Sequence, residues 1–213
     1  MKKLICLALA VLLTAGTLAS CGKKSDKKVF RYTVDENLFN VIEEDGTSKF
    51  DIVRAENAPA EVLSACIALK NAILENTGVE LEVKSDFEKA GYAEYQRQDN
   101  EILVGHTNRE ESGLAANELS KARDTAILQS GTRIAILAGD DRYIGDAVQT
   151  FIDEFIHPDT CTVSAEPSQK VVSHYDYPVK SFTINGADIS EYAVTYSSDE
   201  YKSIADGIRS FVY

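Results

Sequence analysis

The spacing of the apolar residues constrains the fold of this chain more than any other feature of its sequence. Two stretches, 59–77 and 144–155, place apolar side chains three and four positions apart, as one face of an amphipathic helix does. Short apolar runs of strand length surround them, at residues 50–54, 79–83, 101–105, 125–129 and 133–138. This mixture predicts an α/β (α+β) fold over residues 29–165, a two-layer sandwich in which helices pack mainly on one face of a small mixed sheet.

Local signals indicate where several of these elements begin and end. Asn57 is a typical N-cap and Pro59 a typical first-turn residue, so we expect the first helix to begin beside them. Gly78 supplies the left-handed residue that ends many helices. Ser130-Gly131 separates two strand-like runs and predicts a hairpin. Residues 85–100 are mostly polar with scattered aromatic residues, which indicates a loop.

The two ends of the chain carry weaker patterns. Phe30–Val34 alternates and predicts a strand. Residues 166–191 are expected to be a linker, and 192–213 the beginning of a second, truncated repeat. At a constant offset, six positions of the first strand and helix match positions near the C-terminus: Phe50 with Tyr192, Ile52 with Val194, Asn57 with Asp199, Val62 with Ile204, Cys66 with Ile208, and Leu69 with Phe211. A true repeat predicts a strand at 189–196 and a helix capped by Asp199; chance similarity of two amphipathic helices is the alternative.

The first 21 residues have the pattern of an export signal. Two lysines precede the apolar run Leu4–Ala15, which is too short to anchor stably in a bilayer. The next residues, Leu18-Ala19-Ser20-Cys21, resemble the lipobox of bacterial lipoproteins. The resemblance implies that a signal peptide, residues 1–20, is removed and that Cys21 receives a diacylglyceryl group with palmitate-type chains. The alternative is an ordinary secretory signal with a chance cysteine.

The same resemblance implies a location for the protein. Residues 21–28 have no apolar side chain to bury beyond Cys21, and we expect a disordered tether there. Two acyl chains suffice for lasting anchorage, so the expected location is the extracytoplasmic side of the cell membrane. Removal of the two signal lysines changes the net charge from −12 to −14. Such a surface repels nucleic acid phosphates, which excludes nucleic acid as an expected partner.

Two cysteines, Cys66 and Cys161, remain beyond Cys21. They can form a disulfide in an oxidising compartment. Cys66, however, falls on the apolar face of a predicted helix, where a free thiol behaves as a small hydrophobe, so we expect two unpaired thiols. The sequence has no Cys-x-x-Cys pair, no phosphate loop and no histidines at metal-site spacing. We therefore expect neither a metal nor a cofactor.

The loop 105–109, GHTNR, joins the end of a strand-like run to a predicted helix. Ligands often bind at such strand ends in α/β folds. Within this loop His106 can act as a base, Arg109 can hold an anion, and Asn108 offers an amide. Thr107 and Asn108 also have the character of ordinary helix caps.

A second candidate loop contains Asp140, Asp141 and Arg142. Paired carboxylates suit acid–base chemistry or a metal ion. Adjacent side chains point in different directions, however, and acids before a helix stabilise its N-terminal dipole, which is the plainer interpretation. We assign no catalytic residue, and the six candidates for ligand binding are His106, Asn108, Arg109, Asp140, Asp141 and Arg142.

Three stretches of the sequence resemble a known domain. They are the helix 59–78 followed by VELEV, the segment EILVGHTNREES (101–112), and ILQSGTRIAILAGDDRYIGDAVQTFIDEF (127–155). Together they are similar to the small α/β domain that precedes the catalytic barrel in β-hexosaminidases and α-glucuronidases. INGADISEY, at 184–192, matches a motif that recurs in a group of exported bacterial proteins. In the glycosidases this domain contributes no catalytic residue, so the resemblance implies a non-catalytic domain.

These inferences favour a membrane-anchored extracytoplasmic lipoprotein with a non-catalytic accessory or binding module linked to carbohydrate handling. Its expected partners are the membrane and either a glycan or a larger carbohydrate-active protein. One alternative is a small glycan or cell-envelope hydrolase that uses His106 with Asp140 or Asp141, which requires these side chains to converge in a pocket. A further alternative is the ligand-binding lipoprotein of a transporter.

Overall fold

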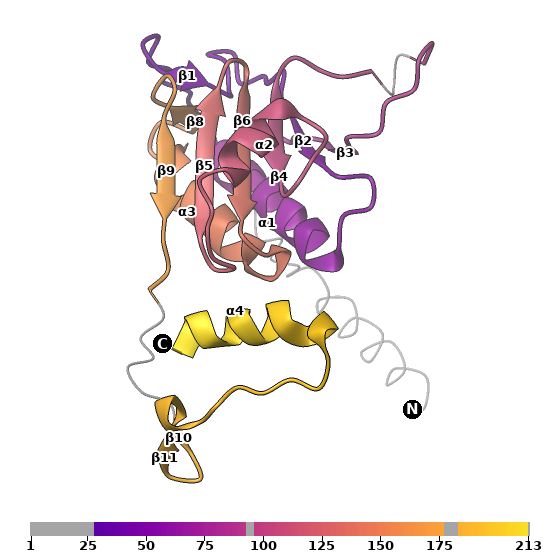
Figure 1. Ribbon diagram of the computed structural model, residues 1–213. Coiled ribbons are helices and arrows are strands. Elements are labelled where there is room, and N and C mark those ends of the chain that lie inside the picture. The colour runs from indigo at the N-terminus through magenta and orange to yellow at the C-terminus, as the bar shows by residue number, and fades with distance from the viewer. Residues whose placement is uncertain (1–27, 93–95, 177–182, 213) are drawn as a thin grey trace, which may run out of the picture.

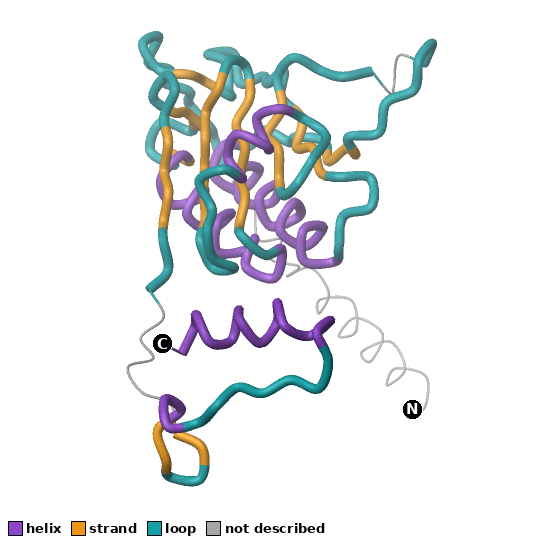
Figure 2. The backbone as a smooth tube through the Cα atoms, in the orientation of Figure 1, coloured by secondary structure: helices purple, strands orange, loops and turns teal. Residues whose placement is uncertain are grey.

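The computed structural model describes residues 28–92, 96–176 and 183–212. The expected signal peptide 1–20, Cys21 and all of the expected tether except Lys28 lie outside the described residues. Within the described ranges, no helix has the length and hydropathy required to cross a bilayer. The described chain forms an α/β body, followed by a smaller C-terminal part (Figures 1 and 2).

The body is built on a six-stranded mixed sheet with the order β3-β2-β4-β6-β5-β9. The strands are β2 (Asp51–Arg54), β3 (Val83–Ser85), β4 (Glu101–Val104), β5 (Thr125–Ser130), β6 (Arg133–Ala138) and β9 (Lys170–Ser173). Strands β3, β2, β4 and β6 are parallel, and β5 pairs antiparallel with both β6 and β9. The predicted hairpin is confirmed, since β5 and β6 are joined at Gly131, whose φ is +59°.

Helices cover the two faces of this sheet unequally. The long helices α1 (Ala60–Thr77) and α3 (Ile144–Phe155) pack on one face, and the short α2 (Glu110–Ala116) packs on the other. The strands supply both faces because successive side chains point to opposite sides. Ile52 and Ile102 therefore join the core under α1 and α3, whereas Val53 and Leu103 join the smaller cluster beside α2. The predicted sandwich, with its helices mainly on one face, is confirmed.

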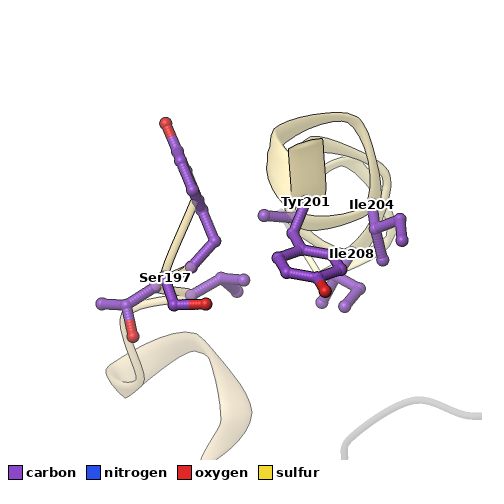
Figure 3. Close-up of a pocket in the computed structure, with 8 residues that line it drawn as sticks. Ser197, Tyr201, Ile204 and Ile208 are labelled. Carbon is purple, nitrogen blue, oxygen red and sulfur yellow. The ribbon is translucent and has the colours of Figure 1, made fainter. Parts of the chain in front are cut away.

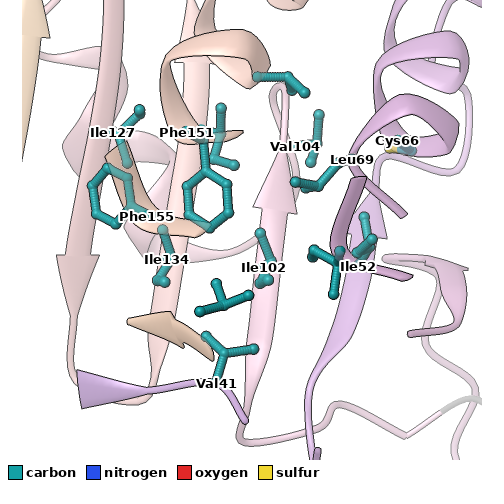
Figure 4. Close-up of a cluster of buried hydrophobic side chains, with 14 of the residues drawn as sticks. Val41, Ile52, Cys66, Leu69, Ile102, Val104, Ile127, Ile134, Phe151 and Phe155 are labelled. Atoms are coloured by element: carbon teal, nitrogen blue, oxygen red, sulfur yellow. The ribbon is translucent and has the colours of Figure 1, made fainter. Parts of the chain in front are cut away.

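The main core lies between the sheet and the two long helices (Figure 4). The rings of Phe151 and Phe155 from α3 stack with their centroids 4.8 Å apart, and both side chains are fully buried. Leu69 and Cys66 from α1 approach Ile52 from the same side (Figure 4). A small antiparallel sheet extends this core, and its strands are β1 (Phe39–Asn40), β8 (Thr162–Ala165) and β7 (Ile156–His157).

The strand expected at Phe30–Val34 is wrong, since these residues adopt no regular structure. They cross the end of α1 as an irregular segment held by side chains. The Tyr32 hydroxyl donates to the Thr77 carbonyl at 2.9 Å, and the Phe30 ring lies so close to Gly78 that a Cβ there would be 2.5 Å away. Alternation in this segment reflects packing against the helix end and not strand pairing.

The ends of α1 are partly as expected. Gly78 is the C-cap with φ +74°, and its N–H donates to the Leu74 carbonyl at 2.8 Å, so that prediction is confirmed. The N-cap expected at Asn57 is wrong. The turn in which Ala58 N–H donates to the Ala55 carbonyl keeps Asn57 outside the helix, and Pro59 takes the N-cap position.

The C-terminal part begins with the hairpin of β10 (Thr183–Ile184) and β11 (Ala187–Asp188) and ends with α4 (Lys202–Val212). The 3-10 helices η3 (Ile189–Glu191) and η4 (Asp199–Tyr201) lie between them. A strand expected at 189–196 is wrong, because 189–191 are helical and 192–196 are irregular. The helix itself is formed, although Ser198, and not Asp199, is the N-cap of η4. The strand half of the suggested repeat is therefore missing from this region.

Candidate functional site

The candidate residues gather at one edge of the main sheet. Strands β2, β4 and β6 are parallel, so the loops that follow them leave from the same edge. Gly105, directly after β4, has φ +76°, and a Cβ there would lie 3.8 Å from Asp141 Oδ1 and 3.2 Å from a Val62 methyl group. The loop with His106 and the loop with Asp141 are therefore neighbours.

His106 does not complete a catalytic pair in this arrangement. Its side chain is exposed, and within the described part of the chain it shows no hydrogen bond or ion pair with Asp140 or Asp141. Asp141 Oδ1 is buried and has no hydrogen-bond partner among the described residues. The loops are adjacent, but these side chains do not converge as a base and an acid.

Asp140 and Arg142 bind each other. The Asp140 carboxylate caps the 3-10 helix η2 (Asp141–Tyr143) by accepting from Arg142 N–H at 3.0 Å, and it also accepts from the Arg142 guanidinium at 2.8 and 2.9 Å. The guanidinium hydrogen bonds and the N–H hydrogen bond lower the pKa of Asp140 to about 2. This carboxylate is thus a permanently charged helix cap, which agrees with the plainer interpretation of the sequence.

Arg109 is buried and its guanidinium is committed to carboxylates of the protein itself, which corrects the role considered for it. Its Nε and Nη2 atoms donate to the two oxygens of Glu101, each at 2.9 Å. Its Nη1 atom donates to Glu88 and to Asn108 Oδ1. The side chains of Arg109 and Glu101 are only 3% and 1% exposed, so this is a buried bidentate ion pair.

Asn108 belongs to a second set of internal bonds, centred on Asp86. Asp86 accepts from Asn108 N–H at 2.7 Å and from Glu56 N–H at 2.8 Å, and its own carbonyl accepts from the Asn108 amide at 2.9 Å. Asp86 N–H in turn donates to the Arg54 carbonyl. One buried aspartate therefore ties together the loops that follow β2, β3 and β4.

Glu101 and Arg133, which were not among the candidates predicted from the sequence, belong to this network. Arg133 donates to Glu101 at 2.8 Å and to Glu111 of α2 at 3.0 Å. Burial alone would raise the pKa of Glu101, but the hydrogen bonds and charges of Arg109 and Arg133 outweigh it and hold that pKa below its usual range. The signal in the sequence was a lone acid, Glu101, at the start of an otherwise apolar strand.

Asp124 is another buried acid that the sequence analysis did not single out. It is fully buried, and it accepts from the N–H groups of Ser120, Lys121 and Tyr175 and from the His174 ring. Burial opposes ionisation, but these hydrogen bonds hold the pKa of Asp124 well below its usual range. The Arg123 guanidinium stacks 3.9 Å from the centroid of the Tyr175 ring. The segment that follows β9 is thus attached to the body through His174 and Tyr175.

A hollow with a volume of about 590 Å³ lies in the C-terminal part. Figure 3 shows Tyr201, Ile204 and Ile208 of η4 and α4 on one side of it and Ser197 on the other. Tyr201, Ile204 and Ile208 are substantially exposed. This groove has aliphatic and aromatic walls and brings no acid–base pair together.

Metal and thiol chemistry find little support in the described ranges. No group of three or more His, Cys, Asp or Glu side chains there is placed to hold a metal ion. Cys66 and Cys161 are both buried and free, so the expectation of unpaired thiols is confirmed. Burial raises the pKa of the Cys66 thiol to about 11, which keeps it protonated and unreactive at neutral pH.

No protein-family model matches the chain, and no curated protein matches its sequence. This chain is weakly similar to solved structures of glycoside hydrolases. A GH138 enzyme targeting pectin rhamnogalacturonan II matches 55% of this chain and 11% of its own, with 16% identity and a TM-score of 0.34. The chitobiase FjGH20 of Flavobacterium johnsoniae matches 66% of this chain and 19% of its own, with 12% identity and a TM-score of 0.38. CpGH84D matches 70% of this chain and 23% of its own, with 12% identity and a TM-score of 0.33.

The chain therefore spans less than a quarter of each of these three proteins. A similarity of this size carries neither an activity nor a substrate over to the present chain.

Proposed function

We propose that this protein is a non-catalytic binding module of a carbohydrate-handling system, anchored by a lipid on Cys21 to the extracytoplasmic side of the cell membrane. The anchor and the location rest on the sequence of residues 1–21. The link to carbohydrates rests on the three stretches between 59 and 155 that resemble an accessory domain of glycosidases.

The commitment of the charged candidates to internal bonds carries the non-catalytic part of this proposal. Arg109 is paired with Glu101, Asp140 is paired with Arg142, and Asp86 joins three loops. Each group is used to hold a loop or a helix end. A general acid at neutral pH needs a carboxyl group with a raised pKa, whereas those of Glu101, Asp124 and Asp140 are all lowered.

Affinity electrophoresis through gels that contain soluble polysaccharides tests this proposal. The full chain with Cys21→Ser is run through pectin, xylan, glucomannan and soluble chitosan, with a gel lacking polysaccharide as the reference. We expect at least one polysaccharide to retard the protein, and no new reducing ends to appear on prolonged incubation. Unretarded migration in every gel overturns the carbohydrate assignment. Release of reducing ends that is lost in His106→Ala overturns the non-catalytic one.

A further inference from the structure

A small, partly open cavity lies on the α2 side of the main sheet. Its volume is about 160 Å³. Helix α2 packs against β5 and β6, so it leaves the neighbouring strands β2 and β3 without a helix on this face. Described residues of the segment between β3 and β4, here called the covering segment, contribute Phe87, Gln96 and Gln98 to the same cavity. Strands and covering segment together line the cavity with Asp51, Val53, Lys84, Ser85, Phe87, Gln96, Gln98, Glu101 and Arg109.

The charges around this cavity are balanced in pairs. Lys84 Nζ lies 2.8 Å from Asp51 Oδ2, and Arg109 holds Glu101 through two bonds of 2.9 Å. Two acids therefore face two bases. A charged ligand would have to compete with one of these pairs and leave its partner uncompensated, which is costly where side chains are as buried as those of Glu101 and Arg109. The lining favours an uncharged ligand.

The remaining lining groups match an uncharged ligand with many hydroxyl groups. The side-chain oxygens of Gln96 and Gln98 provide acceptors, and the Ser85 hydroxyl provides a donor and an acceptor, which sugar hydroxyl groups can satisfy. The Gln96 amide nitrogen already donates to the carbonyls of Lys89 and Tyr92. Val53 and Phe87 supply apolar surface for the C–H face of a ring. Ligand pockets usually measure roughly 300–1,000 Å³, so a cavity of this size suits a single ring and not an oligosaccharide.

We propose that this cavity binds one neutral monosaccharide unit, free or at the end of a glycan. The buried pair Glu101–Arg109 forms its rigid floor, and Gln96, Gln98 and Phe87 form its contacts from the covering segment. This inference rests on the proposed function and specifies which sugars the protein takes and where they bind.

Titration of the full Cys21→Ser chain with monosaccharides, followed by NMR of the glutamine side-chain amides, tests the site. The neutral panel is glucose, galactose, mannose and N-acetylglucosamine, and glucuronate is the charged counterpart. We expect at least one neutral sugar to bind with Kd on the order of 1 mM and to shift amide signals of Gln96 and Gln98. Equal or tighter binding of glucuronate overturns the proposal, and so does the absence of binding by every neutral sugar.

Variants of the covering segment distinguish this cavity from any other site. Gln98→Ala removes one amide, whose side chain otherwise donates to the Gln96 carbonyl, and Phe87→Ala removes apolar surface. Each is expected to weaken binding roughly 3- to 10-fold, the value of one lost contact. Gln149→Ala is the matched control, because Gln149 is an exposed glutamine on α3 that bonds only locally to Asp153. The Gln149→Ala variant should bind the sugar with the same affinity as the parent chain.

The outcomes separate the two proposals. Unchanged affinity in both Gln98→Ala and Phe87→Ala, with melting temperatures preserved, places the sugar elsewhere and overturns the cavity. Polysaccharide retardation without any monosaccharide binding also overturns the cavity but leaves the proposed function in place. Absence of both polysaccharide retardation and monosaccharide binding in the parent chain overturns both proposals.

Discussion

At the scale of single residues, the ion network around Glu101 is the part of the molecule most sensitive to substitution. Glu101→Gln removes the bidentate counter-charge of the buried Arg109 guanidinium and leaves it with the half-exposed carboxylate of Glu88. Removing one partner of a buried pair typically costs about 3–5 kcal/mol, and we expect a loss of that size in the free energy of unfolding measured by urea denaturation. Glu118→Gln is the control, since its pair with Lys170 is half-exposed and should contribute less than about 1 kcal/mol. Equal losses in the two variants would contradict the assignment.

Because the pKa of Glu101 is lowered in the folded protein, the stabilisation that this residue provides depends on pH. In the folded protein the carboxyl group ionises below its ordinary value of 4.5, so the folded state binds fewer protons than the unfolded state around that pH. The stabilisation is present above about pH 5 and is lost as the pH falls through the folded pKa. Urea midpoints of the parent and Glu101→Gln should therefore differ most near neutral pH and approach each other below about pH 4. A difference that grows on acidification would refute this reading.

The sequence predicted where the candidate residues lie but not what they bind. A polar loop after an apolar strand was sufficient to place His106, Asn108 and Arg109 at the edge of the sheet. The hydrogen-bond partners within the network of Arg109 and Glu101 could not be predicted from the sequence, because they depend on how the strands pair. Glu101 lies eight positions earlier and Arg133 comes from the next strand, which meets Glu101 only through the parallel register of β4 and β6.

At the scale of elements, α3 and α4 look alike as sequence patterns but differ in what covers them. Phe151 of α3 is fully buried, whereas Ile204 of α4 is 61% exposed. Phe151→Ala should cost about 3–5 kcal/mol in the free energy of unfolding, because it removes a large core side chain and leaves a cavity. Ile204→Ala should change it by less than about 0.5 kcal/mol. A large loss from Ile204→Ala would show that another surface covers this face of α4 in solution.

Periodicity predicted the long elements well because it reports directly on burial. The faces of α1 and α3 and the hairpin β5–β6 were found at nearly their observed positions. The failures were short alternating segments, Phe30–Val34 and 189–196. Alternation alone does not show whether a partner strand is available, and a run of that length becomes a strand only when a neighbour accepts its hydrogen bonds.

At the scale of the whole molecule, the described chain divides into a body that buries its apolar side chains in a core and a C-terminal part that leaves large apolar side chains exposed. The body buries its apolar residues between the sheet and the helices, and Asp124 attaches the start of the linker to it. The C-terminal part keeps Ile204 and Ile208 largely exposed. Neither part contains a described helix that could span a bilayer. The proposed lipid anchor, Cys21, lies outside the described residues.

The proposed anchor is directly testable on the intact chain. Cys21→Ser removes the thiol that would carry the diacylglyceryl group, and a protein without its two acyl chains loses lasting membrane affinity. Membrane fractionation of the producing bacterium should recover the parent chain in the membrane pellet and the processed Cys21→Ser chain in the soluble fraction. Cys6→Ser is the control, because it alters a cysteine within the expected signal peptide and leaves Cys21 in place, so its product should stay in the pellet. A Cys21→Ser chain that is cleaved after its signal and still sediments with the membrane would show that attachment comes from protein surface and not from lipid.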